Sequence, residues 1–162
     1  MFRKGSAVSL LFVVFVALIT YTCGDYKKVL KSTDLQYKYD RAIQYYDEGE
    51  CYKAYPLFEE LLAVYRGTKK SEDIYYRLAY CDYRLKDYIL ASHRFEQFYN
   101  NFPYSGKAEE CTFMSAYCHY LNSPKPSLDQ TDTEEAITAF RLFVNKYPYS
   151  PRIDTCNVLM DE

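Results

Sequence analysis

A repeat with a step of 37 residues dominates this sequence. Two residue types recur at that step: Ala42, Ala79 and Ala116, and Tyr46, Tyr83 and Tyr120. Self-similarity at a period of roughly 20–50 residues is typical of proteins built from stacked supersecondary units. In such a stack each unit packs on its neighbours, and binding takes place on an extended surface. The sequence therefore predicts a repeat protein whose function lies on a surface and not in a catalytic pocket.

The second half of each unit has its own motif, an alanine followed four residues later by a phenylalanine. It occurs three times: Ala54 and Phe58, Ala91 and Phe95, and Ala136 and Phe140. The first two copies are 37 residues apart, but the third follows after 45 residues. The third unit therefore holds eight extra residues, which we place in the Pro- and Ser-containing segment 122–130 and predict as a loop.

Apolar residues spaced three and four apart predict an amphipathic helix in both halves of every unit. Ser71, followed by acidic residues, is expected to be the N-cap of one helix. Ser150 before Pro151 has the pattern of another helix start. We predict helices over residues 34–49, 51–65, 72–86, 88–101, 106–121, 133–146 and from 151 onward.

The pattern resembles the tetratricopeptide (TPR) repeat, in which a small residue in helix A is followed by Ala and Phe in helix B and by a closing Pro. The second unit matches in register from Ala79 to Pro103, whereas Arg66 stands where the first unit should have proline. The resemblance implies an all-α, right-handed TPR helical-hairpin solenoid over residues 34–162. It would hold about three repeats plus the start of another helix, and we expect it to be the N-terminal part of a longer array.

The N-terminus has the layout of an export signal. A short basic start precedes an apolar run over residues 7–19, which is short for a bilayer span and suits the hydrophobic core of a signal peptide. Cys23 follows, and this arrangement resembles a bacterial lipoprotein processing site. The resemblance implies a lipoprotein signal peptide over residues 1–22, a lipidated Cys23 and a linker over residues 23–33. The alternative is an ordinary signal peptide, or an uncleaved anchor, with an incidental cysteine.

The net charge of the chain restricts the classes of partner that it can bind. Without the two basic residues of segment 1–22, the chain keeps 18 basic and 22 acidic side chains, a net charge of about −4. An acidic domain without a basic stripe excludes nucleic acid as a partner.

The cysteine spacing argues against disulfides. Cys81 and Cys118 would occupy equivalent points of neighbouring helices. Helix axes pack about 8–10 Å apart, whereas a disulfide needs Cα atoms within about 7 Å, so we predict buried free thiols.

The sequence contains no motif of an enzyme. His93 and His119 lie in different predicted helices, and His119 cannot pair with the adjacent Cys118 because neighbouring helical residues point about 100° apart. The chain has no C-x-x-C pair and no glycine-rich phosphate loop. We therefore expect a protein that is not an enzyme, with no catalytic residue, no metal site and no cofactor.

The TPR resemblance also implies a binding surface. In that family the second, fifth, ninth, twelfth and thirteenth residues of each unit line the concave face. Transferred onto this chain, these positions hold eight aromatic residues: Tyr39, Tyr46, Tyr76, Tyr80, Tyr83, Phe113, Tyr117 and Tyr120. Tyrosine combines a flat apolar ring with a hydroxyl and suits the binding of extended peptides. The alternative is that these rings pack one helix against the next.

A TPR array behind a lipoprotein signal resembles the BamD family of outer-membrane assembly lipoproteins. The insertion after Leu121 is similar to that of members from the Bacteroides group. The connectors over residues 102–105 and 147–150 share an aromatic-Pro-Tyr-Ser pattern that also fits this family. The resemblance covers about the first three of the family's five repeats.

This resemblance implies a protein that is lipid-anchored on the periplasmic face of the outer membrane and binds extended segments of unfolded outer-membrane proteins. Its implied partners are the BamA barrel, other assembly-complex subunits, unfolded outer-membrane proteins and, through the lipid, the membrane. Two alternatives stay open. One is another envelope TPR lipoprotein that acts as an adaptor for cell-wall or division proteins. The other is an enzyme of cell-wall or thiol chemistry, for which we find no catalytic residues.

Overall fold

The computed structural model describes residues 25–124 and 128–161, and regular structure in these residues is entirely helical. The labelled helices are α2 (Leu35–Asp47), α3 (Cys51–Tyr65), α4 (Lys69–Arg84), α5 (Tyr88–Asn101), α6 (Ala108–Asn122), α7 (Thr131–Lys146) and α8 (Ile153–Asp161). Every helix predicted from the sequence is present, and the predicted ends agree within three residues. The all-α class is therefore confirmed.

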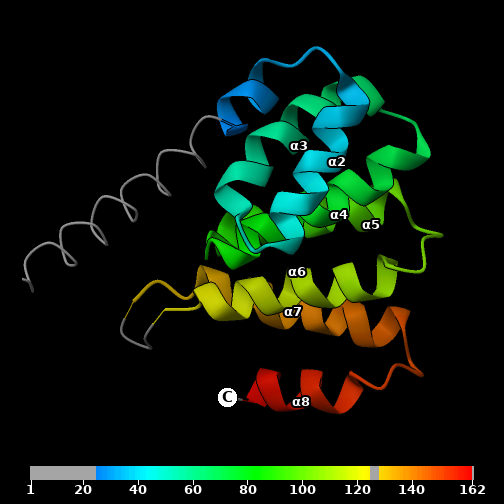
Figure 1. Cartoon of the computed structure of the whole chain (residues 1–162). Coiled ribbons are helices and arrows are strands. Elements are labelled where there is room, and N and C mark those ends of the chain that lie inside the picture. The colour runs from blue at the N-terminus through cyan, green and yellow to red at the C-terminus, as the bar shows by residue number, and fades with distance from the viewer. Residues whose placement is uncertain (1–24, 125–127, 162) are drawn as a thin grey trace, which may run out of the picture.

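Consecutive helices are the main packing partners along the chain. α2 packs on α3, α3 on α4, and the series continues through α7 and α8. Figure 1 shows the helices in layers that run from the N-terminal helices to α8 at the opposite end. Because each helix packs on its neighbours in the sequence, the core is divided along the stack into three clusters of buried residues.

The repeated alanines and phenylalanines form this core, as their spacing predicts. Side chains of both types are at most 3 % exposed in all three units: Ala42, Ala54, Phe58, Ala79, Ala91, Phe95, Ala116, Ala136 and Phe140. Alanine lets two helices approach closely, and phenylalanine fills the space beside them. Full burial of a phenylalanine side chain stabilises a fold by about 1.5–3 kcal/mol.

α2 and α4 end in the same kind of turn, one with glycine and the other with lysine. Gly49 has φ +80° and Lys86, 37 residues later, has φ +64°. In both turns this residue donates its amide to the carbonyl three residues back, and the next amide reaches five residues back. This is the Schellman pattern of helix ends. A left-handed backbone costs a residue with a side chain about 1–2 kcal/mol, so Lys86 is the strained copy.

α4 begins three residues before the predicted start, and the predicted N-cap is wrong. Ser71 is not the N-cap, because the helix begins at Lys69 and Thr68 is the cap residue. Ser71 is buried, and its hydroxyl donates to the carbonyl of Thr68 at 2.6 Å. Gly67 has φ +78°, a conformation that glycine adopts readily. The chain therefore turns early enough to include Lys69 and Lys70 in the helix.

The segment expected as a linker, residues 23–33, contains a helical stretch over residues 25–31. Val29 in this stretch is fully buried and belongs to the first core cluster. The ring of Tyr26 lies edge-on to the ring of Tyr45 in α2, with the centroids 5.7 Å apart. The described part of this segment is therefore packed on the domain. Residues 1–22 and Cys23 lie outside the described residues.

The prediction of free buried thiols is confirmed for the described residues. Five cysteines there are free and buried: Cys51, Cys81, Cys111, Cys118 and Cys156. Burial raises the pKa of the Cys118 thiol to about 12 and also raises that of Cys111. The thiolate is the reactive form, so burial disfavours the reactive form of Cys118 and Cys111 at neutral pH. Among the residues that the structure describes, no helix is both long and apolar enough to cross a bilayer.

Candidate functional site

The eight aromatic residues predicted for a binding surface lie on α2, α4 and α6, and we call them the A-helix aromatics. Tyr46 is buried and the other seven are partly buried. All eight rings belong to or pack against the three core clusters. The rings therefore stabilise the stack, as the packing alternative holds. Their role in binding a peptide stays a prediction.

Alternate helices are joined by a repeated set of three side chains, which we call the clasp. Between α2 and α4, the hydroxyl of Tyr39 donates to Oδ2 of Asp73 at 3.1 Å. The ammonium of Lys70 lies 4.9 Å from the centroid of the Tyr39 ring. A clasp thus consists of an aromatic residue on one helix, with a cation and an acid at the start of the next helix but one. A cation over an aromatic ring contributes about 0.5–1 kcal/mol at exposed sites.

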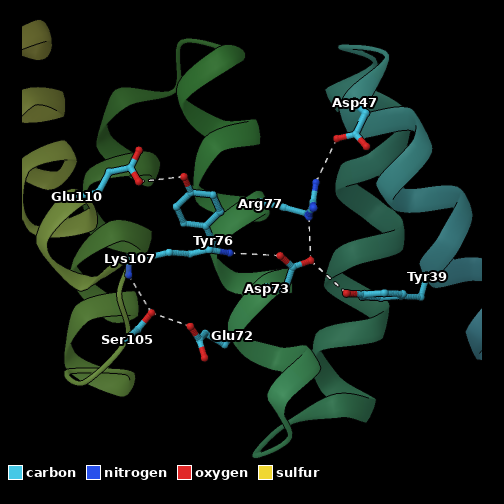
Figure 2. A network of polar contacts seen from close by, with 9 residues as sticks. All are labelled: Tyr39, Asp47, Glu72, Asp73, Tyr76, Arg77, Ser105, Lys107 and Glu110. Atoms are coloured by element: carbon cyan, nitrogen blue, oxygen red, sulfur yellow. Dashed lines mark hydrogen bonds and ion pairs between the residues drawn. The ribbon is translucent and has the colours of Figure 1, made fainter.

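The same clasp recurs 37 residues later, between α4 and α6. The hydroxyl of Tyr76 donates to Oε2 of Glu110 at 3.1 Å, as Figure 2 shows. The ammonium of Lys107 lies 4.2 Å from the centroid of the Tyr76 ring. Since all three members shift by the repeat step, the clasp is a property of the repeat and not of one pair of helices.

The third junction, between α6 and the residues that lead into α8, keeps only the cation and the ring. Phe113 stands where the other units have tyrosine, so the hydroxyl is missing. The guanidinium of Arg152 lies 5.4 Å from the centroid of the Phe113 ring. Arg152 follows Lys107 by 45 residues, the step that includes the insertion. This junction therefore retains the contact but lacks the hydrogen bond.

A second link, between a connector serine and a glutamate, survives the insertion. The hydroxyl of Ser105 donates to Glu72 at 2.6 Å, and the hydroxyl of Ser150 donates to Glu109 at 2.7 Å. These serines close the two aromatic-Pro-Tyr-Ser connectors. Their hydroxyls also accept the amides of residues two positions later. The serine in the connector motif therefore has a structural role, because it ties the connector to the preceding unit.

Asp73 is the centre of the polar network in Figure 2. Arg77 donates from Nε to Asp73 at 2.8 Å and from Nη1 to Asp47 at 3.2 Å. The ammonium of Lys107 lies 3.3 Å from Asp73. Burial alone would raise the pKa of Asp73, but the hydrogen bond and charge of Arg77, with the charge of Lys107, hold that pKa below its ordinary value. The ionised carboxylate therefore ties three successive units together.

Three of the tyrosine hydroxyls are occupied within the protein. Glu110 accepts hydrogen bonds from both Tyr76 and Tyr80, and Tyr39 donates to Asp73. Burial, followed by the neighbouring carboxylate, raises the pKa of Tyr39 and of Tyr76 to about 12. The pKa of Tyr80 is also raised, chiefly by burial. These hydroxyls hold neighbouring helices and are not available to a ligand in this structure.

α6 carries three nearly parallel rings, which we call the aromatic row: Phe113, Tyr117 and Tyr120. Phe113 and Tyr117 have centroids 5.9 Å apart at 12°, and Tyr117 and Tyr120 have centroids 6.0 Å apart at 18°. The hydroxyls of Tyr117 and of the nearby Tyr83 make no hydrogen bond to another described residue. The aromatic row and Tyr83 thus combine half-buried rings with two unused hydroxyls.

The sequence analysis missed the cationic members of the clasp. Lys70, Lys107 and Arg152 recur at steps of 37 and 45 residues, the steps of the alanine and phenylalanine motif. These cations lie outside the alanine, phenylalanine and tyrosine positions that define the repeat and outside the five groove-lining positions of the TPR family. An alignment of the charged positions by the same steps identifies all three cations from the sequence alone.

The two histidines have different surroundings. His93 is exposed, and its Nε2 lies 2.9 Å from the side chain of Gln97. His119 has its Nδ1 3.1 Å from Oε2 of Glu135 and 3.9 Å from Oδ1 of Asp132. The sequence analysis does not anticipate this group, because the insertion separates His119 from both acids along the chain.

Comparison with known proteins agrees with the resemblance inferred from the sequence. A family model described as "YfiO: Outer membrane lipoprotein" matches residues 32–160. The chain is also 23% identical over 150 residues to the outer membrane protein assembly factor BamD of Caulobacter vibrioides, an alignment that covers 91% of this chain and 49% of that protein. The chain thus spans about half the length of the curated relative that it matches. Because the family match covers most of its length, the chain belongs to the YfiO family of outer membrane lipoproteins.

Proposed function

We propose that this protein is a component of the machinery that assembles β-barrel proteins in the outer membrane. In this role it is a lipid-anchored TPR scaffold that binds extended segments of unfolded outer-membrane proteins and partner subunits. The observation that carries the proposal is the family match over residues 32–160, together with the likeness to an assembly factor over most of this chain.

The scaffold in this proposal is a right-handed solenoid of TPR hairpins. α2–α3, α4–α5 and α6–α7 form three hairpins, and α8 begins another. Two observations support this architecture: consecutive helices pack on one another, and the clasp joins alternate helices at the repeat step. A solenoid offers an extended surface built from equivalent helices, which is what an extended peptide requires.

The anchor is a lipid on Cys23 at the periplasmic face of the outer membrane, after removal of residues 1–22. The family description as outer membrane lipoproteins supports this assignment. Two or more acyl chains hold a protein firmly on a bilayer, whereas one is marginal. The described domain begins at residue 25, and Val29 is already buried in the core. The folded domain therefore lies close to the membrane surface in this proposal.

Among the A-helix aromatics, the aromatic row and Tyr83 are best suited to hold a substrate peptide. Their rings are partly exposed, and the hydroxyls of Tyr83 and Tyr117 are unused within the described structure. Rigid aromatic side chains supply contact area at a low cost in conformational entropy. An extended strand places alternate side chains on opposite sides, so the aromatic side of an unfolded barrel strand would face the row.

The proposed partners are the BamA barrel and other subunits of the assembly complex, besides unfolded outer-membrane proteins. Because the chain spans about half the length of its curated relative, these partners are proposals for this chain. The role is that of a scaffold, so it requires no catalytic residue and no cofactor. The acidic net charge gives no reason to include nucleic acid.

The test of this role is affinity purification of the full-length protein from detergent-extracted membranes. Mass spectrometry then identifies the co-purified proteins and the N-terminal peptide. We expect the BamA barrel together with a lipidated Cys23, and we expect Cys23→Ala to shift the protein out of the membrane fraction. Recovery of cell-wall or division proteins without the BamA barrel would overturn the proposal in favour of an envelope adaptor.

The peptide surface has its own test. A fluorescent peptide with the sequence of a barrel strand is titrated with the purified protein, and anisotropy gives the Kd. We expect Tyr117→Ala to weaken binding by about tenfold, the size of a moderate hot spot. The matched control is Tyr104→Ala, because Tyr104 is fully exposed on a connector. Equal binding by Tyr117→Ala and the unmodified protein would remove the aromatic row from the site.

A further inference from the structure

A histidine and two carboxylates converge where the chain leaves α6 for the insertion and enters α7. His119 lies in the last turn of α6. Asp132 and Glu135 lie near the start of α7, and their spacing of three places them on one side of the helix. One donor atom from each of the three residues lies within 4.8 Å of the other two. The insertion of the third unit therefore ends in a compact group of metal-ligating atoms.

The separations suit a small metal ion. Nδ1 of His119 lies 3.1 Å from Oε2 of Glu135 and 3.9 Å from Oδ1 of Asp132. A tetrahedral ion with bonds of about 2.0–2.2 Å holds its donor atoms about 3.3–3.6 Å apart. This lies between the two distances that Nδ1 of His119 makes with the carboxylate oxygens, and all three donor atoms lie within 4.8 Å of one another. Asn122 donates to the other oxygen of Asp132 at 2.7 Å. A ligand that is itself hydrogen-bonded in this way is fixed in orientation.

The surroundings carry uncompensated negative charge. Two adjoining cavities of about 550 and 390 Å³ share His119, Glu135 and Glu96 in their walls, and Glu134 lines the larger one. Neither cavity is lined by a lysine or arginine among the described residues. Glu96 and Glu134 form no ion pair with any residue that the structure describes. A cation that binds here therefore meets no competing lysine or arginine from the walls of these cavities.

We propose that His119, Asp132 and Glu135 bind a divalent transition-metal ion, for which Zn²⁺ is the probe. Calcium and magnesium prefer all-oxygen sites, whereas an imidazole with carboxylates suits zinc and its neighbours in the first transition row. The ion would replace the contact between His119 and Glu135 and join α6 to α7 at the neck of the insertion. It would thereby brace the one hairpin whose helices are separated by the inserted segment. None of its three residues is one of the A-helix aromatics, and the site does not depend on the proposed function.

Calorimetric titration of the chelator-treated protein with zinc chloride tests the site. We expect one ion per chain and a higher Tm when the ion is bound. His119→Ala and Glu135→Gln should each weaken binding by about tenfold or more and remove the rise in Tm. Asp154→Asn is the matched control, because Asp154 is exposed on α8 and lines neither cavity. Circular dichroism verifies that each variant keeps its helical content.

Two spectroscopic measurements assign the ligands. The chain has two histidines, so its imidazole NMR spectrum contains two sets of signals, and Zn²⁺ should shift those of His119 far more than those of His93. Substitution with Co²⁺ should give the visible bands of a site with nitrogen and oxygen donors. Thiolate charge-transfer bands would place the ion on cysteine and overturn the proposal. Absence of binding, or equal binding by His119→Ala, would also overturn it.

Discussion

The junction between α4 and α6 and the junction between α6 and α8 are copies of one design with different hydrogen bonds. In the first, Tyr76 binds Glu110 through its hydroxyl while Lys107 lies over its ring. In the second, Phe113 has no hydroxyl, and Arg152 alone continues the pattern. Both junctions nevertheless place their aromatic ring against a core cluster. The comparison therefore separates two contributions to the free energy of unfolding: that of the packed ring, and that of the hydrogen bond between the hydroxyl and the carboxylate.

The clearest way to test whether the two regions are equally packed is to truncate one core phenylalanine in each. Phe95→Ala and Phe140→Ala should each lower the free energy of unfolding by about 3–5 kcal/mol, because both side chains are fully buried. Urea denaturation followed by circular dichroism measures the change. A cost below about 1 kcal/mol for Phe140→Ala would mean that the region after the insertion is loosely packed.

The two glutamates at the start of α6 allow the polar contacts of the two junctions to be compared directly. Glu110→Ala removes the acceptor of both Tyr76 and Tyr80, so we expect a loss of about 2 kcal/mol. Glu109→Ala removes the acceptor of Ser150 and a partly exposed ion pair with Arg152 at 3.8 Å, and should cost about 1 kcal/mol. Both residues lie in the first turn of α6, so changes in helix propensity and dipole cancel in the comparison. If the two variants lost the same free energy of unfolding, the polar contacts of the α4–α6 junction would not be the stronger ones.

Acid should weaken the first junctions through Asp73. Its pKa is lower in the folded than in the unfolded chain, so the unfolded chain binds more protons at low pH. The stability due to this carboxylate is complete above the unfolded pKa of about 3.9 and is lost as the pH falls through the folded value. We expect Asp73→Asn to flatten the fall in unfolding free energy below about pH 4. Thermal unfolding between pH 2 and 6 measures the slope, and an unchanged slope in the variant would refute this role of Asp73.

The apolar half of the repeat could be predicted from the sequence because burial acts at every unit. An alanine or phenylalanine that recurs at a fixed step has the same surroundings in each copy, and Phe58, Phe95 and Phe140 are all fully buried. The polar contacts between units could not be predicted from short stretches of sequence. Tyr39 and Asp73 are 34 residues apart, and each is an ordinary surface residue until the units stack. Their pairing depends on the distance between helices, which no short motif encodes.

Two other features escaped prediction for different physical reasons. The position of the α4 start depends on the left-handed turn at Gly67, whereas Ser71 followed by acids is a frequent but not unique sign of a helix start. The group around His119 depends on how the insertion returns the chain to α7. A loop of that length closes at little entropic cost in many conformations, so the sequence does not determine which residues meet at its ends.

The smallest expected effect comes from rebuilding the missing part of the clasp. Thr155 on α8 follows Glu110 by 45 residues and is exposed. Phe113→Tyr alone should change stability by less than about 0.5 kcal/mol, because no carboxylate stands at the equivalent position. Combined with Thr155→Glu, it should show a favourable coupling of about 0.5–1 kcal/mol in a double-mutant cycle. Zero coupling would show that the α6–α8 junction differs in backbone spacing as well as in side chains.

The buried thiols provide the chain with native reporters of local opening. Cys51 and Cys81 belong to the first core cluster, Cys111 and Cys118 to the second, and Cys156 to the third. A thiol reagent can reach each of them only when its part of the stack opens. The rate of labelling at each cysteine, read by mass spectrometry, therefore measures the free energy of opening separately for each cluster. The stability of this repeat protein can thus be resolved along its length without introducing any additional cysteine.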